Sequence, residues 1–92
     1  MNRKEILVTA SDLVSVDRAE QYGDARQSFN RISDLWSVYL EKHLSVTDVA
    51  NMMVLLKVSR AVSNSSHEDS YIDMAGYAAL AGEMATGEDN GS

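Results

Sequence analysis

The sequence contains no cysteine and no proline, and its apolar stretches are short. The absence of cysteine excludes disulfide bonds, thiolate metal sites and cysteine nucleophiles. The absence of proline means that nothing forces a helix to break, so turns must be made by Gly, Ser, Asn and Asp. No apolar run approaches transmembrane length, and the polar start lacks the apolar core of a signal peptide. We therefore expect a protein of a reducing cytoplasm that does not associate with membranes.

Basic residues are absent from the last quarter of the chain. The net charge is −6, yet residues 1–66 carry eight acidic and eight basic side chains, which cancel. Residues 67–92 carry six acidic side chains and no Lys or Arg. Because an acidic protein does not attract phosphate backbones, direct nucleic-acid binding is not expected. The acidic quarter either binds a divalent cation or a basic protein surface, or it is a solvated helix and tail.

Apolar periodicity and punctuation predict four helices, at about residues 3–20, 25–42, 45–62 and 68–85. Short connections between them favour an antiparallel bundle or a dimer of helical hairpins. Because so short a chain buries only a modest core, we expect dimerisation to complete the bundle. The sequence therefore predicts an all-α fold with one helical domain at residues 1–85 and a disordered acidic tail at residues 86–92.

Local signals refine the last two helices. Ser45 and Asp48 have the spacing of a capping box at the start of the third helix. That helix is apolar nearly all the way round, which is typical of a central, buried helix. Ser66 is positioned to cap the fourth helix. Gly76 and Gly82 lower its helix propensity, and we expect them to allow close approach of a neighbouring helix. The methionines are expected to fill the core.

Two cations interrupt the most apolar helix. Lys57 and Arg60 are three residues apart, so both point to one side. Asp69 and Asp73 are four apart on the next helix and share a face in the same way. A short loop makes these helices antiparallel neighbours, so the two pairs should meet. Either they form a charge network that fixes helix register, or the cations receive phosphates and the carboxylates hold Mg²⁺.

A few other polar residues are candidates for the same cluster. Asp17 and Arg18, near the end of the first helix, and the hydroxyl of Tyr22 could join it, with Arg18 and Tyr22 as further phosphate contacts. His43 and His67 are isolated, and the sequence contains no P-loop and no dinucleotide-binding glycine motif.

Three stretches together carry a resemblance to a known family. They are Asp17-Arg18 with Tyr22-Gly23 and Phe29, the segment Met53–Arg60, and His67–Ser70 with Asp73–Ala78. In this order and spacing they resemble a family of small phage and prophage proteins of unknown function, over about residues 5–84. That family is similar to the MazG-like, all-α nucleoside triphosphate pyrophosphohydrolases. The resemblance implies a helical homo-oligomer in the host cytoplasm that binds a nucleotide with Mg²⁺.

In MazG-like enzymes, acidic residues on two adjacent helices hold the metal. Asp69 and Asp73 match one half of that signature, whereas the glutamate-rich helix of the other half has no counterpart here. The second predicted helix offers only Asp34 and Glu41. Whether the chain is an enzyme therefore stays open. One hypothesis is a nucleotide-binding or nucleotide-hydrolysing protein of MazG-like type. The other is a non-catalytic phage accessory protein that binds a host or phage protein through its acidic surface.

Overall fold

The computed structural model describes residues 1–15 and 25–87, and within these residues it is helical, with no strand. The helices are α1 (Arg3–Leu13), α3 (Ala25–Leu40), α4 (Val46–Ser63) and α5 (Glu68–Thr86). The predicted all-α class is confirmed. The predicted tail lies outside the described residues from position 88 onward, and α5 ends at Thr86 on Gly87, whose left-handed φ of 72° suits glycine.

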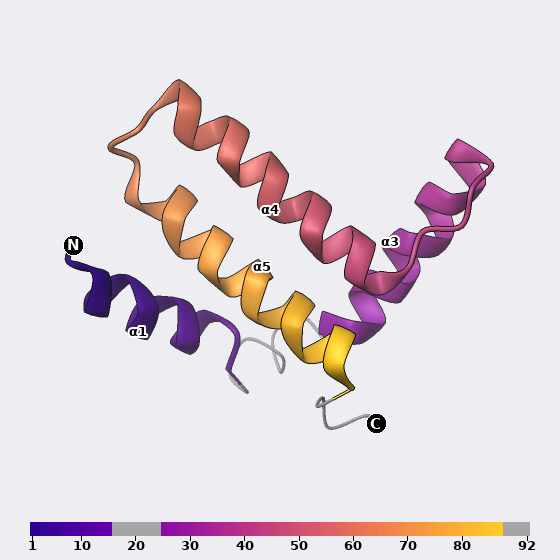
Figure 1. The fold of residues 1–92 in the computed structure, drawn as a ribbon, viewed down its shortest axis with the longest axis horizontal. Coiled ribbons are helices and arrows are strands. Elements are labelled where there is room, and N and C mark those ends of the chain that lie inside the picture. Colours follow the sequence, from indigo (N-terminus) through magenta and orange to yellow (C-terminus); the bar gives the residue numbers. More distant parts are fainter. Residues whose placement is uncertain (16–24, 88–92) are drawn as a thin grey trace.

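Three helices lie side by side, with α5 between α1 and α4, and α3 packs against α4 at one end (Figure 1). The most extensive contact joins α4 and α5, which run antiparallel as predicted. The core lies where the first half of α4 and the second half of α5 meet α3. Its buried members are Phe29, Val49, Ala50, Ala81 and Met84, with Ile32, Trp36, Val46, Tyr77 and Leu80 packed around them.

Helix α1 is shorter than the sequence predicts. It ends at Leu13, because Val14 leaves helical geometry and the Ser15 hydroxyl donates to the Asp12 carbonyl at 2.6 Å. A serine that bonds to nearby backbone in this way competes with helix continuation. The rest of the predicted helix, from residue 16 to residue 20, lies outside the described residues.

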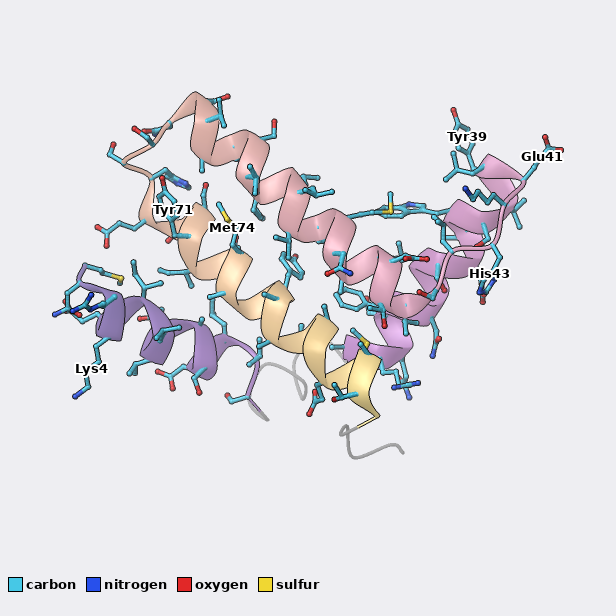
Figure 2. The ribbon with its side chains drawn as sticks, in the orientation of Figure 1. Lys4, Tyr39, Glu41, His43, Tyr71 and Met74 are labelled. Carbon is cyan, nitrogen blue, oxygen red and sulfur yellow. The ribbon has the colours of Figure 1, made fainter. Side chains whose placement is uncertain are left out.

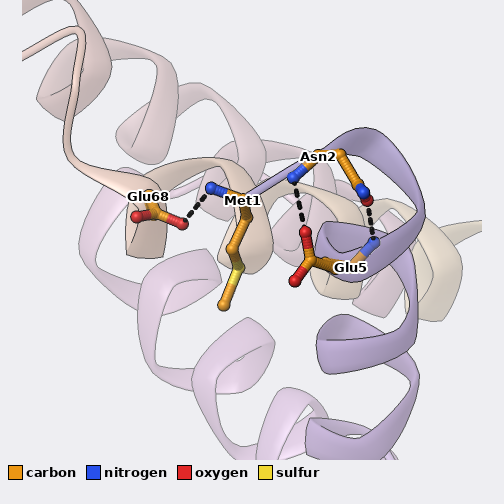
Figure 3. Close-up of polar contacts among 4 residues, drawn as sticks. All are labelled: Met1, Asn2, Glu5 and Glu68. Atoms are coloured by element: carbon orange, nitrogen blue, oxygen red, sulfur yellow. Dashed lines mark hydrogen bonds and ion pairs between the residues drawn. The ribbon is translucent and has the colours of Figure 1, made fainter.

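Helix α1 is fixed to α5 at two points. At its start, Asn2 and Glu5 form a capping box, and the Met1 amine bonds to the Glu68 carboxylate at 2.9 Å (Figure 3). The hydrogen bond to Glu68 raises the pKa of that amine. Further along, the expected close approach is found at Gly76, where a built Cβ would lie 3.4 Å from the Val14 Cγ1, a distance of ordinary van der Waals contact that does not require glycine. The same expectation for Gly82 is wrong within the described residues, because a Cβ there would meet nothing within 4 Å.

The loop between α4 and α5 does not use the predicted cap. His67 is the N-cap residue of α5 and makes no side-chain cap hydrogen bond, while the Ser66 hydroxyl donates instead to Asn64 at 3.1 Å. The loop is held by the Tyr71 hydroxyl, which donates to the Ser65 carbonyl at 2.9 Å. Local side-chain bonds of this kind stabilise a tight turn without capping the helix.

The loop between α3 and α4 ends in the predicted capping box. Glu41 adopts a left-handed φ of 54°, which turns the chain out of α3. The Ser37 hydroxyl then accepts a hydrogen bond from the Leu44 amide at 2.9 Å. Ser45 and Asp48 each accept from the backbone amide of the other at 3.0 Å, so the predicted capping box is confirmed.

Removal of the Ser45 cap should lower stability. We expect Ser45→Ala to lower the free energy of unfolding by about 1 kcal/mol, because the Asp48 amide loses its partner at the helix start. Urea denaturation measures the change. Ser63→Ala, at the exposed last turn of the same helix, is the matched control and should change stability by less than about 0.5 kcal/mol. Equal effects of the two substitutions would contradict the capping role.

The same cap gives a pH dependence of known sign. The hydrogen bond from the Ser45 amide holds the pKa of Asp48 below its ordinary value of 3.8. A carboxyl whose pKa is lower in the folded state stabilises the fold above its unfolded pKa and loses that contribution as pH falls through the folded pKa. Asp48→Asn should therefore flatten the acid limb of the stability profile.

Helix α4 is less buried than its apolar sequence predicts. Val49, Ala50 and Ala61 are buried, whereas Leu55 and Val62 are 66% and 80% exposed. The expectation of a central helix buried on all sides is therefore wrong for the single chain, because only one side of α4 is covered by α5 and α3. The methionines are divided in the same way: Met84 is buried, while Met74 is half-buried on α5 (Figure 2) and Met52 is exposed. No described helix is long and apolar enough to span a membrane.

Candidate functional site

Lys57 and Asp73 form an ion pair between the two longest helices. The Lys57 Nζ lies 2.9 Å from the Asp73 Oδ2. Both side chains are mostly shielded, being 19% and 31% exposed. The pair exists because Lys57 lies on the side of α4 that faces α5, opposite the exposed Leu55. The structure therefore brings one of the two predicted cations together with one of the two predicted carboxylates.

Arg60 and Asp69 lie near the pair but remain apart from it. Arg60 is three residues beyond Lys57 on α4, and Asp69 is four residues before Asp73 on α5. Both are exposed, and neither has an ion pair among the described residues. The four charged side chains thus do not form one closed network. Two are joined and partly buried, and two remain available to solvent.

The surroundings of the pair are built by α5 and α3. Ser70, which is almost fully buried, lies 3.1 Å from the His67 Nδ1 at the loop end of α5. At the other end, one turn beyond Asp73, the Tyr77 ring packs against Phe29 with their centroids 6.2 Å apart. Asp73 therefore lies on α5 between a hydrogen-bonded turn and the apolar core.

The site offers a metal ion few ligands by itself. Across residues 1–15 and 25–87, no group of three or more His, Asp or Glu side chains is arranged to hold a metal. Asp69 and Asp73, one turn apart, could supply two carboxylates. Mg²⁺ commonly uses one or two protein carboxylates and completes its shell with water and substrate phosphates. The donor set fits Mg²⁺ that arrives with a phosphate ligand, and it does not fit a resident metal held by protein alone.

The remaining predicted site residues cannot be placed. Arg18 and Tyr22, together with Asp17, lie outside the described residues. The sequence did not predict the exposed apolar face of α4. An all-round apolar helix predicts burial, but its residues do not indicate which element packs against each side. His43 lies beyond the end of α3 and His67 at the start of α5, so the two histidines are on different elements.

Comparison with known proteins finds a family model and two phage proteins that this chain is similar to. Residues 5–85 match the family model DUF6378, described as a domain of unknown function. The Gene 55 protein of Mycobacterium phage L5 is 41% identical over 85 residues, which cover 91% of this chain and 54% of that protein. The Gene 55 protein of Mycobacterium phage D29 is 45% identical over 75 residues, covering 82% of this chain and 50% of that protein.

The chain therefore spans about half the length of the curated relatives that it matches. No solved structure matches it. The match to the family model covers nearly the whole chain, including all four described helices apart from the first two residues of α1 and the last residue of α5. The chain belongs to the DUF6378 family, a domain of unknown function represented among mycobacteriophage proteins.

Proposed function

We propose that this protein binds a nucleoside triphosphate together with Mg²⁺ at the end of the α4–α5 hairpin. The observation that carries the proposal is the Lys57–Asp73 pair, a cation and a carboxylate shielded from solvent on otherwise apolar helix faces. Partly burying two charges is costly, and replacement by apolar residues is often neutral or stabilising. A pair at such a position is better explained by a ligand that uses both charges than by stability alone.

Each charged residue has a role in this proposal. Mg²⁺ is held by Asp73 and Asp69, and the triphosphate by Lys57 and Arg60. In the free protein Lys57 neutralises Asp73, so neither charge is left unpaired in a partly buried place. With the Asp73 carboxylate engaged by a bound metal, the Lys57 ammonium would be free to donate to a phosphate oxygen. The exposed Arg60 supplies the planar, multidentate donor that phosphate favours.

The resemblance to MazG-like pyrophosphohydrolases supports the same ligand class. Asp69 and Asp73 have the spacing of one half of the metal-binding signature in those enzymes. The other half would lie on α3, and α3 carries a single acidic residue, the exposed Asp34. We therefore propose binding as the function, since hydrolysis would need carboxylates that α3 does not provide. Arg18 and Tyr22 are further candidate phosphate contacts.

Exposed residues of the site allow a test that does not disturb the fold. The melting temperature of the wild type is measured with Mg²⁺ and each of the four deoxynucleoside triphosphates in turn. At least one of these nucleotides should raise it. A ligand at about 1,000 times its dissociation constant stabilises by about 4 kcal/mol. In the Arg60→Ala and Asp69→Asn variants the melting temperature without ligand should fall by only a few degrees, because both are exposed charges that complement the dipoles of their helix ends, and the ligand-dependent rise should be lost.

Matched controls are available on the same protein. Arg31→Ala and Glu83→Gln remove exposed charges from α3 and from the far end of α5, and both variants should respond to nucleotide as the wild type does. A wild type that shows no thermal shift with any of the nucleotides would overturn the proposal. Release of pyrophosphate in the same samples would show that the protein is an enzyme, despite its missing glutamates.

A second candidate function is supported by the charge of α5. This helix carries Glu68, Asp69, Asp73 and Glu83 and no basic residue. A non-catalytic accessory protein could bind a basic surface of a host or phage protein there, with an association that weakens as salt rises. The two candidates separate in the thermal experiment, because an accessory protein of this kind would not respond to nucleotide and Mg²⁺.

A further inference from the structure

The Lys57 side chain already occupies one side of the carboxylate that the proposed site offers to a metal. Its Nζ lies 2.9 Å from the Asp73 Oδ2, the distance of a charge-assisted hydrogen bond. Lys57 is 19% exposed and Asp73 is 31% exposed, so dissolved salt screens this contact less than it screens a fully exposed pair. A cation that approaches Asp73 therefore meets a positive charge that belongs to the protein.

The second carboxylate oxygen of Asp73 does not avoid this charge. Both oxygens belong to one small group, so a divalent ion at the free oxygen would still lie close to the Lys57 ammonium. Like charges repel more strongly where the surroundings are less polar than bulk water. Repulsion from Lys57 thus offsets the free energy that a metal ion gains from Asp73, as long as the ammonium stays in place.

Asp69 is a weak substitute for Asp73 as the first contact of a metal ion. It is exposed in the first turn of α5 and has no ion pair among the described residues. Mg²⁺ gives up its water reluctantly and is usually held by one or two carboxylates together with substrate phosphates. The free protein therefore offers a metal ion one open carboxylate, which is too little by itself, and one carboxylate that a cation already holds.

We infer that Lys57 is a built-in counter-ion that keeps free metal ions off Asp73, so that the site takes a metal only in complex with a nucleotide. The inference rests on the proposed function and specifies how its site is controlled. A phosphate group gives the Lys57 ammonium a new anionic partner, so Lys57 can leave Asp73 without becoming an unpaired charge in a shielded place. A metal ion alone brings no such partner. By linkage, the metal and the phosphate ligand strengthen each other's binding by the same factor.

Binding of Mn²⁺ in the absence of nucleotide tests this role of Lys57. Mn²⁺ takes the same oxygen ligands as Mg²⁺, and electron paramagnetic resonance measures its free concentration. The wild type should bind Mn²⁺ weakly, and Lys57→Met should bind it more tightly by about 10-fold or more, because Asp73 loses its competing cation. Lys57→Arg keeps a cation beside Asp73 and should bind Mn²⁺ as weakly as the wild type.

Lys42→Met is the matched control. It removes one positive charge from an exposed position between α3 and α4, at the other end of α4 from Lys57, and should bind Mn²⁺ as the wild type does. Circular dichroism shows whether each variant is helical, and Lys57→Gln takes the place of Lys57→Met if the latter does not fold. Equal Mn²⁺ affinity in the wild type and the uncharged Lys57 variant, or an equal gain in Lys57→Arg, would overturn the inference. The comparison contains no nucleotide, so its outcome is separate from the thermal-shift test of the proposed function.

Discussion

Phe29→Ala should reduce the free energy of unfolding by about 3–5 kcal/mol, the range for loss of a buried aromatic side chain. Phe29 is 6% exposed and belongs to the core that joins α3 to α4 and α5, and its ring packs against Tyr77. Its removal leaves a cavity at the place where α3, α4 and α5 meet. For a domain of this size the melting temperature should fall by more than about 12 °C.

A second aromatic residue on the same helix provides the control. Tyr39 is 86% exposed and projects from the far end of α3 (Figure 2), so Tyr39→Ala should change stability by less than about 0.5 kcal/mol. Chemical denaturation followed by circular dichroism measures both variants. A loss of less than 1 kcal/mol for Phe29→Ala, or similar losses for the two variants, would show that α3 is not held by this core.

The Lys57–Asp73 pair should show strong coupling between two substitutions. Lys57→Met or Asp73→Leu alone leaves one partly buried charge without its partner, and each should lower stability by about 1–3 kcal/mol, between the values for exposed and fully buried pairs. The double variant replaces both charges by apolar side chains. It should regain most of the loss or exceed the wild type, because the cost of keeping two charges from solvent disappears.

A double-mutant cycle in urea measures this coupling, and Lys42→Met with Glu83→Gln serves as an exposed pair of unconnected charges for comparison. Additive losses in the Lys57 and Asp73 cycle would mean that the 2.9 Å contact contributes nothing. A double variant that is much less stable than the wild type would mean that the pair stabilises the fold in its own right, which would remove the main argument for a ligand.

Much of the fold could be predicted from local signals. The capping box at Ser45 and Asp48 and the antiparallel α4–α5 hairpin follow from short-range spacing, and the structure has both. The signals failed where two residues competed for one role. Ser66 has the better capping side chain, but its hydroxyl donates to the Asn64 side chain within the loop. Helix α5 therefore begins after His67.

The burial of α4 could not be predicted in the same way. Apolar residues on all sides indicate that a helix is covered, but they do not indicate what covers it. Here the described helices cover one side of α4, and Leu55 faces outward. The candidate site was also predicted only in part. The spacing of Lys57 and Asp73 was enough to place them face to face, whereas no spacing shows whether Arg60 and Asp69, which stand apart from the pair, bind a ligand.

The most direct test of the proposed function is a calorimetric titration of each deoxynucleoside triphosphate into the wild type and into the Lys57→Met/Asp73→Leu double variant. With Mg²⁺ present, the wild type should bind at least one of the nucleotides, and chelation of the metal should abolish the heat. The double variant should give no heat while it melts at or above the wild-type temperature, because it has lost the ligands and kept the fold. Absence of binding to the wild type, or equal binding by the double variant, would contradict the proposal that this ion pair is a nucleotide site.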